Sequence, residues 1–386
     1  MTTLPMTMSA RQVVQQFQAA CAGGDLARCQ GLFNEHGRSL RWVLNRCFAK
    51  ACEHNQVAVA QWLSTLVPID IRGQFDGVIK TVCSAGYEDL AKWLWSQIPQ
   101  SHRQQYLART CFHMACLAGS LPLVQHFFPK LLVCGGGGDG DGEEKEEAVV
   151  EWNTRCEQVY YDMAVKDACR EGRLEVVQWL HQTTTSMHLP DFIKFPDAFH
   201  NACIHNRLAV AQWLWSTCVQ EGHKDLAHIQ ESATVDFADA CGRGHLAIVQ
   251  WLLQGEGKEE VEGGLAAPPP VDVHYSEERP LQWACQCGHL AIVQCLLKFY
   301  DVHAPGFWTT PRACGVCLAF DKACKFGFFH VAAWMRQECP HDAPWPGRAL
   351  QKLQHYHWEG NRSIWVATVL RAQSVGVRSL VCNIPI

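Results

Sequence analysis

The amino-acid sequence predicts an all-α solenoid of nine to ten stacked helical hairpins. A cysteine recurs along the chain, mostly at intervals of 31 to 44 residues. A large apolar residue always stands four positions before that cysteine. A glycine three positions after it and a tryptophan ten positions after it are frequent. Self-similarity at such a period is typical of repeat proteins, in which each unit buries its apolar face against its neighbours.

The recurring residue sets the register of the array, and we call it the repeat cysteine. It is found at Cys21, Cys52, Cys83, Cys116, Cys169, Cys203, Cys241, Cys285 and Cys324. The apolar residue before it is Phe17, Phe48, Ile79, Phe112, Val165, Phe199, Phe237, Leu281 or Phe320. All nine copies keep this pair, which excludes a chance alignment.

Each copy predicts two short helices joined by a tight turn. Apolar residues four positions apart lie on one face of a helix, so a first helix is expected to end near each repeat cysteine. The glycine after it suits the left-handed residue that ends a helix. The following segment, for example 246–252, has the rhythm of an amphipathic second helix. The glycine is present at Gly24, Gly86, Gly119, Gly172, Gly244, Gly288 and Gly327.

These copies resemble the ankyrin repeat family. The best correspondence covers 279–285, then Gly288-His289-Leu290 and Leu296-Leu297, while His113 and His200 keep the last letter of the family's Thr-Pro-Leu-His motif. Cysteine replaces the family's second alanine in every copy, and tryptophan often replaces a smaller aliphatic residue. The family's Gly-Ala-Asp finger is not visible. The resemblance therefore implies an ankyrin-like solenoid with short or missing β-fingers.

We expect a single repeat domain over 1–386. The cap at its N-terminal end covers about 9–40, and the repeats cover about 41–339. Two insertions lengthen the intervals around them, an acidic glycine-rich loop at 131–150 and a loop rich in Pro, Gly and Glu at 254–279. Neither insertion shifts the repeat phase, so both are interpreted as loops.

Residues 340–386 are interpreted as a degenerate repeat or cap. Leu353 falls in the apolar slot, His357 in the cysteine slot and Gly360 in the glycine slot. Ile364 and Trp365 begin a predicted second helix. Terminal repeats are atypical because one of their faces meets water.

Composition excludes several classes of protein. The net charge of −5 argues against nucleic-acid binding, which needs a basic face. No apolar run reaches 18 residues, and the first ten residues lack the pattern of an export signal, so we expect a cytoplasmic chain with no membrane partner. The repeat accounts for many of the 21 cysteines, and a reducing compartment fits them. We expect a monomer.

The repeat cysteines stand where the family has a small buried alanine, so we interpret them as core residues rather than as nucleophiles. The tryptophans of the second helices are assigned to the core as well, rather than to a platform for single-stranded nucleic acid. The predicted core residues are Cys52, Cys83, Cys116, Cys169, Cys203, Cys241, Cys285, Cys324, Trp62, Trp93, Trp179, Trp213, Trp251 and Trp334.

Two groups of residues invite a chemical interpretation. Cys314 and Cys317 have zinc-type spacing, but Cys339 and His341 make a poor second pair, so no metal or other cofactor is expected. The Gly-His turns are expected to bond backbone groups of a neighbouring unit instead of performing acid–base chemistry. No catalytic motif is recognised.

The two residues directly after each repeat cysteine vary from copy to copy. The resemblance implies that this part of the first helix lines the concave surface where partners dock, and we call these paired positions the recognition stripe. The alternative explanation is that these positions vary only because substitutions at the surface are tolerated. The candidate partner-binding residues are Glu53, His54, Arg170, Glu171, His205, Arg243, Gln286 and Lys325.

These observations predict a non-catalytic scaffold or adaptor that binds an unidentified protein on the concave face. The alternative is a substrate-recognition subunit that recruits machinery such as a ubiquitin ligase through 340–386. An enzymatic function would rest only on the number of Cys and His residues.

Overall fold

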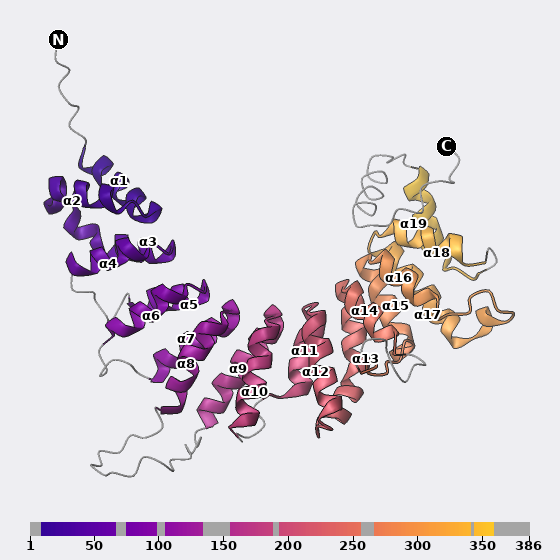
Figure 1. Ribbon diagram of the computed structural model, residues 1–386. Helices are drawn as coiled ribbons and strands as arrows, with labels where there is room; N and C mark the ends of the chain where they lie inside the picture. The colour runs from indigo at the N-terminus through magenta and orange to yellow at the C-terminus, as the bar shows by residue number, and fades with distance from the viewer. Residues whose placement is uncertain are drawn as a thin grey trace. The chain divides into compact units, whose positions relative to one another are not determined.

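Antiparallel helix pairs recur along the chain in the computed structural model, which describes residues 9–66, 75–98, 105–133, 155–187, 193–255, 266–340 and 343–358. Figure 1 shows these helices in chain order. The residues group into two compact units, Met1–Ile193 and Lys194–Ile386. The prediction of one continuous domain remains a prediction.

Unit 1 contains five hairpins, each made of a first and a second helix within the described ranges. They are α1 (Ala10–Gly23) with α2 (Leu26–Leu40), α3 (Leu44–Glu53) with α4 (Val57–Leu66), α5 (Phe75–Ser84) with α6 (Glu88–Gln97), α7 (Gln105–Ala118) with α8 (Leu121–Val133), and α9 (Arg155–Glu171) with α10 (Leu174–Ser186). A short 3-10 helix, Arg41–Val43, precedes α3.

Unit 2 continues the same pattern. Its described pairs are α11 (Phe195–Ile204) with α12 (Leu208–Gln220), α13 (Leu226–Arg243) with α14 (Leu246–Leu253), α15 (Tyr275–Cys287) with α16 (Leu290–Leu297), and α17 (Pro311–Lys325) with α18 (Phe329–Glu338). The 3-10 helix Phe307–Thr309 precedes α17, and α19 (Gly347–Trp358) follows the last pair.

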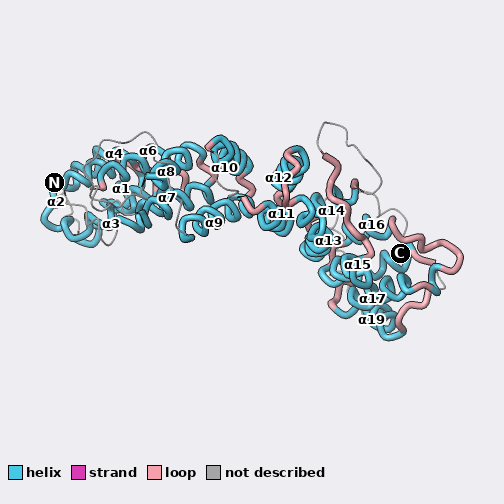
Figure 2. The backbone as a smooth tube through the Cα atoms, turned by 90° about the horizontal axis from the view of Figure 1, so that it is seen from below, coloured by secondary structure: helices cyan, strands magenta, loops and turns pink. Residues whose placement is uncertain are grey.

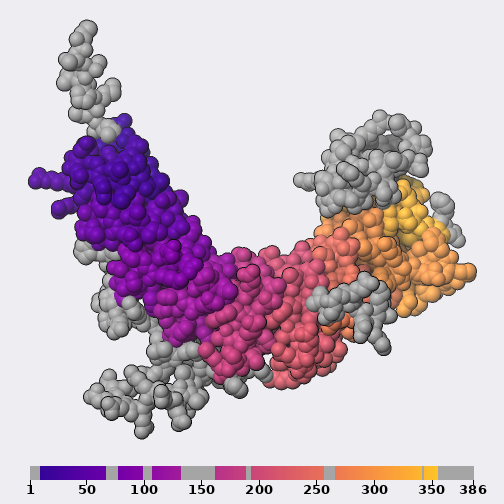
Figure 3. Space-filling model, in the orientation of Figure 1, coloured from indigo at the N-terminus to yellow at the C-terminus, as the bar shows by residue number. Residues whose placement is uncertain are grey.

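Within each unit the helices form two layers. Each first helix contacts the next first helix, as α7 contacts α9 in unit 1 and α15 contacts α17 in unit 2. Figure 2 shows both layers and draws no strand among the described residues. This arrangement confirms the predicted all-α repeat solenoid. Within each unit, Figure 3 shows neighbouring hairpins packed against one another on the face in view.

The turn of each hairpin is made by a left-handed residue three positions after the repeat cysteine. All seven predicted glycines adopt positive φ, from 72° at Gly86 to 84° at Gly244 and Gly327. Asn55 and Asn206 take the same conformation in the two copies that lack the glycine. Asparagine tolerates this region better than other side chains, so the turn survives the substitution.

The repeat cysteine and its apolar partner form the core of every hairpin. The nine repeat cysteines are at most 2 % exposed, and the nine apolar partners at most 7 %. Leu353 of α19 is also buried, at 1 %. The predicted tenth repeat therefore has a first helix with the expected buried residue. Its predicted second helix lies outside the described residues.

The tryptophans are less buried than the sequence predicts. Trp251 is buried, but the other five predicted core tryptophans, Trp62, Trp93, Trp179, Trp213 and Trp334, are only partly buried. Several of them reach the preceding repeat, where Trp62 meets the ring of Phe17 at 6.4 Å and Trp93 meets Phe48 at 6.5 Å. Part of each indole thus packs on a neighbouring repeat, and the rest remains at the surface.

The insertion at 254–279 is a loop only in part. Residues 266–274 pack on the helices of unit 2. Val271 and Val273 are buried, and the indole N–H of Trp215 on α12 donates to the carbonyl of Ala267. Asp272, between the two valines, is exposed. Helix α15 spans Tyr275–Cys287, but Ser276, Glu277 and Glu278 have left-handed φ values of 48°, 58° and 65°. Its regular right-handed part therefore begins only after Glu278, close to the predicted end of the loop.

The insertion at 131–150 begins later than predicted, because α8 continues to Val133. Residues 134–150 and 359–386 lie outside the described residues, and these include Gly360, Ile364 and Trp365 of the predicted tenth repeat. In the described part of the chain, the helices are too short or too polar to cross a bilayer.

Candidate recognition surface

The recognition stripe lies at the C-terminal ends of the first helices. Its candidate residues fall at the last turn or the cap of α3, α9, α11, α13, α15 and α17. Glu53, His54, Arg243 and Lys325 are exposed. Arg170, Glu171, His205 and Gln286 are partly buried. All eight side chains thus reach the surface at equivalent places in different repeats.

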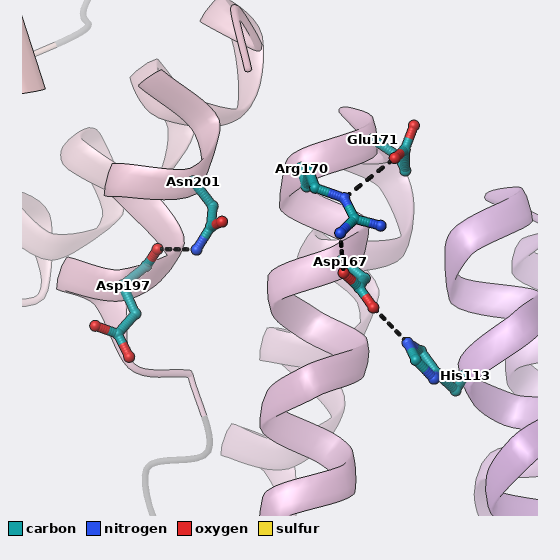
Figure 4. A network of polar contacts seen from close by, with 6 residues as sticks. All are labelled: His113, Asp167, Arg170, Glu171, Asp197 and Asn201. Atoms are coloured by element: carbon teal, nitrogen blue, oxygen red, sulfur yellow. Dashed lines mark hydrogen bonds and ion pairs between the residues drawn. The ribbon is translucent and has the colours of Figure 1, made fainter. Parts of the chain in front are cut away.

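In unit 1, the stripe is tied into the scaffold by ion pairs. Arg170 Nη1 lies 3.0 Å from Asp167 Oδ1, and Arg170 Nε lies 3.3 Å from Glu171 Oε1 (Figure 4). Asp167 also lies 2.6 Å from Nε2 of His113 on the neighbouring α7. A partner that contacts Arg170 must therefore compete with carboxylates of α9.

A similar pair joins α11 and α13 in unit 2. Nδ1 of His200 lies 2.5 Å from Oδ1 of Asp236, whose side chain is 1 % exposed. The hydrogen bond to this carboxylate raises the pKa of His200. Close by on α11, the amide of Asn201 donates to the carbonyl of Asp197 at 2.7 Å (Figure 4). Because Asp236 is buried and already bonded to His200, the pair joins helices instead of offering a free acid–base group.

A repeated hydrogen bond positions the backbone beneath the stripe. The residue four positions after one repeat cysteine donates to the carbonyl one position after the preceding repeat cysteine. His245 Nε2 donates to Ile204 at 2.9 Å, and His289 Nε2 donates to Gly242 at 3.1 Å. This confirms the prediction that both histidines bond backbone groups of a neighbouring repeat.

The same bond is made in unit 1 by a different side chain. Arg173 Nε donates to the carbonyl of Leu117 at 3.0 Å. This position therefore requires a side chain that donates a hydrogen bond and is long enough to reach the carbonyl of the preceding repeat. Histidine itself is not required. In each case, the C-terminal end of one first helix is held against the next repeat, which gives the stripe a defined geometry.

Sequence reasoning missed a further part of this surface. Positions six and two before the repeat cysteine lie on the same helix face as the stripe, since they precede it by whole helical turns. On α15 these positions are Arg279 and Trp283, and on α17 they are Leu318 and Lys322. Helical spacing from the stripe was the signal that could have found them.

The repeat cysteines are poorly suited to nucleophilic chemistry. Burial raises the pKa of Cys52 and of Cys169 to about 12, and it also raises the pKa of Cys241 well above its ordinary value. A thiol in this state carries almost no thiolate at neutral pH. The buried position thus favours a packing role.

The cysteines with zinc-type spacing are spread between the surface and the interior. Cys314 is exposed, while Cys339 is buried. Cys317 Sγ lies 3.5 Å from the carbonyl of Pro344, and His341 is outside the described residues. Within the described ranges, no group of three or more His, Cys, Asp or Glu side chains is arranged to hold a metal ion.

Comparison with known proteins supports the repeat assignment. The family model for the ankyrin repeat matches residues 278–306, which include most of α15 and all of α16. This is the copy with the best correspondence in sequence. A search of curated proteins found no match.

Proposed function

The chain contains an ankyrin repeat, and from this premise we propose that it is a non-catalytic scaffold or adaptor that binds a protein partner on the recognition stripe. The observation that carries the proposal is a contrast within each first helix. The repeat cysteine is buried in every copy, whereas the two positions after it vary and reach the surface. A constant scaffold with variable exposed residues suits recognition.

The cellular setting is part of the same proposal. The described cysteines are free thiols, and most of them are buried. Thiols persist in a reducing compartment, which supports a cytoplasmic location. The alternative role in a ubiquitin-ligase assembly depends on 340–386, and no feature of the described part of that segment favours it.

Affinity capture with the intact chain tests the proposal. A variant with Arg170, Arg243 and Lys325 changed to alanine removes three cations from the stripe. The matched control changes Arg28, Lys298 and Arg336, three exposed cations that lie on or next to second helices. Partners captured by the wild type and by the control, but lost from the stripe variant, would support binding through the stripe.

Circular dichroism establishes that both variants are folded before capture is compared. If the stripe variant retains every partner of the wild type, the proposed surface is wrong. Equal loss from the control and the stripe variant would also contradict it, since net charge alone would then explain the result.

A further inference from the structure

The exposed face of α15 and α17 combines cations with large apolar side chains. On α17, Leu318, Lys322, Lys325 and Phe326 are separated by four, three and one residues, so they share one face of the helix. Leu318 is 48 % exposed and Phe326 is 49 % exposed. Apolar side chains of this size exposed together with charges are typical of interaction sites.

Equivalent positions of α13, α15 and α17 lie side by side. These first helices contact one another in sequence. A Cβ placed on Gly242 of α13 would lie 3.3 Å from Cβ of Trp283 on α15, and His289 is bonded to the carbonyl of Gly242. The ends of the helices are therefore held together, and their exposed residues form one surface, which we call the basic face.

The charge of the basic face is positive. Arg243, Arg279 and Lys325 are exposed, and Lys322 is partly buried. None of these four cations forms an ion pair with a residue in the described ranges.

Aromatic rings support two of the cations. The guanidinium of Arg279 lies 5.3 Å from the ring centre of Trp283, and Nζ of Lys325 lies 5.8 Å from that of Phe326. Asp239, two positions before Cys241 on α13, is an acidic residue on the same helix face, and its charge helps to raise the pKa of His200 on α11. Cations held at the surface without carboxylate partners favour a negatively charged ligand.

We infer that the basic face binds an acidic segment of the partner protein that also carries aliphatic or aromatic side chains. Carboxylates of the segment would pair with Arg243, Arg279, Lys322 and Lys325, and its apolar side chains would cover Leu318 and Phe326. This inference rests on the proposed function, because it specifies the chemistry of the partner at the same surface.

A protein segment fits the basic face better than a nucleic acid does. Nucleic-acid surfaces combine cations with aromatic rings on which bases stack. The exposed aliphatic side chain of Leu318, beside cations, instead offers burial to an apolar side chain of a peptide. A single-stranded oligonucleotide is therefore a competing ligand in the test.

Selection of random twelve-residue peptides displayed on phage, with the intact chain as target, tests the inference. We expect enriched peptides to be negatively charged and to contain Leu, Ile, Phe or Trp. The most enriched peptide is then synthesised with a fluorescent label, and its affinity is measured by anisotropy. Changing Arg279, Lys322 and Lys325 to alanine should weaken binding roughly tenfold or more at low salt.

Two further variants keep the result interpretable. L318S/F326S removes apolar contacts without changing the charge, and it should also weaken binding of the peptide. K298A/R336A changes cations at the second helices, and it should leave binding of the peptide unchanged. Circular dichroism and the unfolding midpoint show whether each variant is folded. A selection that enriches no acidic peptide overturns the inference, as does tighter binding of a twenty-nucleotide DNA strand than of the selected peptide.

The outcomes separate this inference from the proposed function. Neutral or basic peptides that bind the wild type but not the R170A/R243A/K325A variant would overturn the acidic chemistry while leaving the stripe as the docking surface. Peptides whose affinity is unchanged in the R170A/R243A/K325A variant and in both basic-face variants would contradict the proposed function itself.

Discussion

At the scale of single residues, the repeat cysteine acts as a small apolar side chain. Burial raises the pKa of Cys324 to about 11 and that of Cys52 to about 12. Cys287, only two positions after a repeat cysteine, is exposed. Position in the repeat therefore separates protected from accessible thiols.

Alkylation should reveal this separation. With iodoacetamide added to the native chain, Cys287 and Cys314 are expected to react within minutes, and the repeat cysteines only after denaturation. Peptide mass spectrometry reads each site separately and so distinguishes the described cysteines from those in other segments. Rapid native labelling of Cys241 or Cys285 would contradict their burial.

Substitution of the repeat cysteine should reduce stability. Cys241→Leu adds side-chain volume at a site that is 0 % exposed, and the expected loss is about 1–3 kcal/mol of unfolding free energy. Cys287→Leu is the matched control, since the exposed site leaves room and should change stability by less than about 0.5 kcal/mol. Urea unfolding measures both, and equal effects would contradict the packing assignment.

His289 should make the stability of unit 2 depend on pH. Burial lowers its pKa below the ordinary value of 6.5. As pH falls, the unfolded chain takes up the proton before the folded chain does. The contribution of neutral His289 to the unfolding free energy is therefore fully present above pH 6.5, and it is lost as the pH falls through the pKa of the folded state.

The variant His289→Gln keeps a donor for the carbonyl of Gly242 but cannot titrate. Between pH 8 and pH 5, the wild type is expected to lose more unfolding free energy than this variant, as measured by urea titration at each pH. A parallel loss in both proteins would show that His289 does not contribute.

At the scale of the hairpin, the left-handed glycine has two functions. It ends the first helix, and at Gly24, Gly119, Gly244 and Gly288 it also makes room for a side chain of the next repeat. A Cβ on Gly244 would lie 2.6 Å from the ring of His289, and a Cβ on Gly119 would lie 2.5 Å from Arg173. The glycine therefore permits the inter-repeat hydrogen bond beside it.

Two glycine substitutions separate these functions. Gly244 and Gly327 share a φ of 84°, but a Cβ on Gly327 would meet nothing within 4 Å. Gly327→Ala should cost about 1–2 kcal/mol from backbone strain alone. Gly244→Ala should cost about 1 kcal/mol more, because the bond from His289 is disturbed. Thermal unfolding compares the two, and equal losses would exclude the steric function.

At the scale of the whole molecule, contacts are mainly between neighbouring repeats within each unit. Within each unit, a first helix contacts the next first helix along the chain, as α5 contacts α7 and α13 contacts α15. Stability in such an array is approximately the sum of repeat and nearest-neighbour terms, so a local defect should stay local.

Hydrogen exchange should show this locality. In Cys241→Leu, amides of α13 and α15 are expected to exchange faster than in the wild type, while those of α1 and α3 keep their wild-type rates. Mass spectrometry of peptides from the intact chain measures each helix. Uniform acceleration along the chain would instead indicate a single cooperative transition.

The sequence by itself determined the fold class, the register and the turns. Phe237 and Cys241 are four positions apart, so they lie on one helix face, and a glycine after them requires a reversal. These relations are local and can be derived from spacing alone. For the same reason, the positions of the recognition stripe could be predicted, because they are defined by distance from the repeat cysteine.

Only the tertiary structure decided how neighbouring repeats meet. Trp251 is buried whereas Trp62 is not, although both occupy the same slot. Residues 266–274 return to α12, and Trp283 covers Gly242 of another helix. These contacts join side chains that are tens of residues apart, so their packing depends on the shape of both partners. Periodicity specifies which face of a helix is apolar, but it does not specify what covers that face.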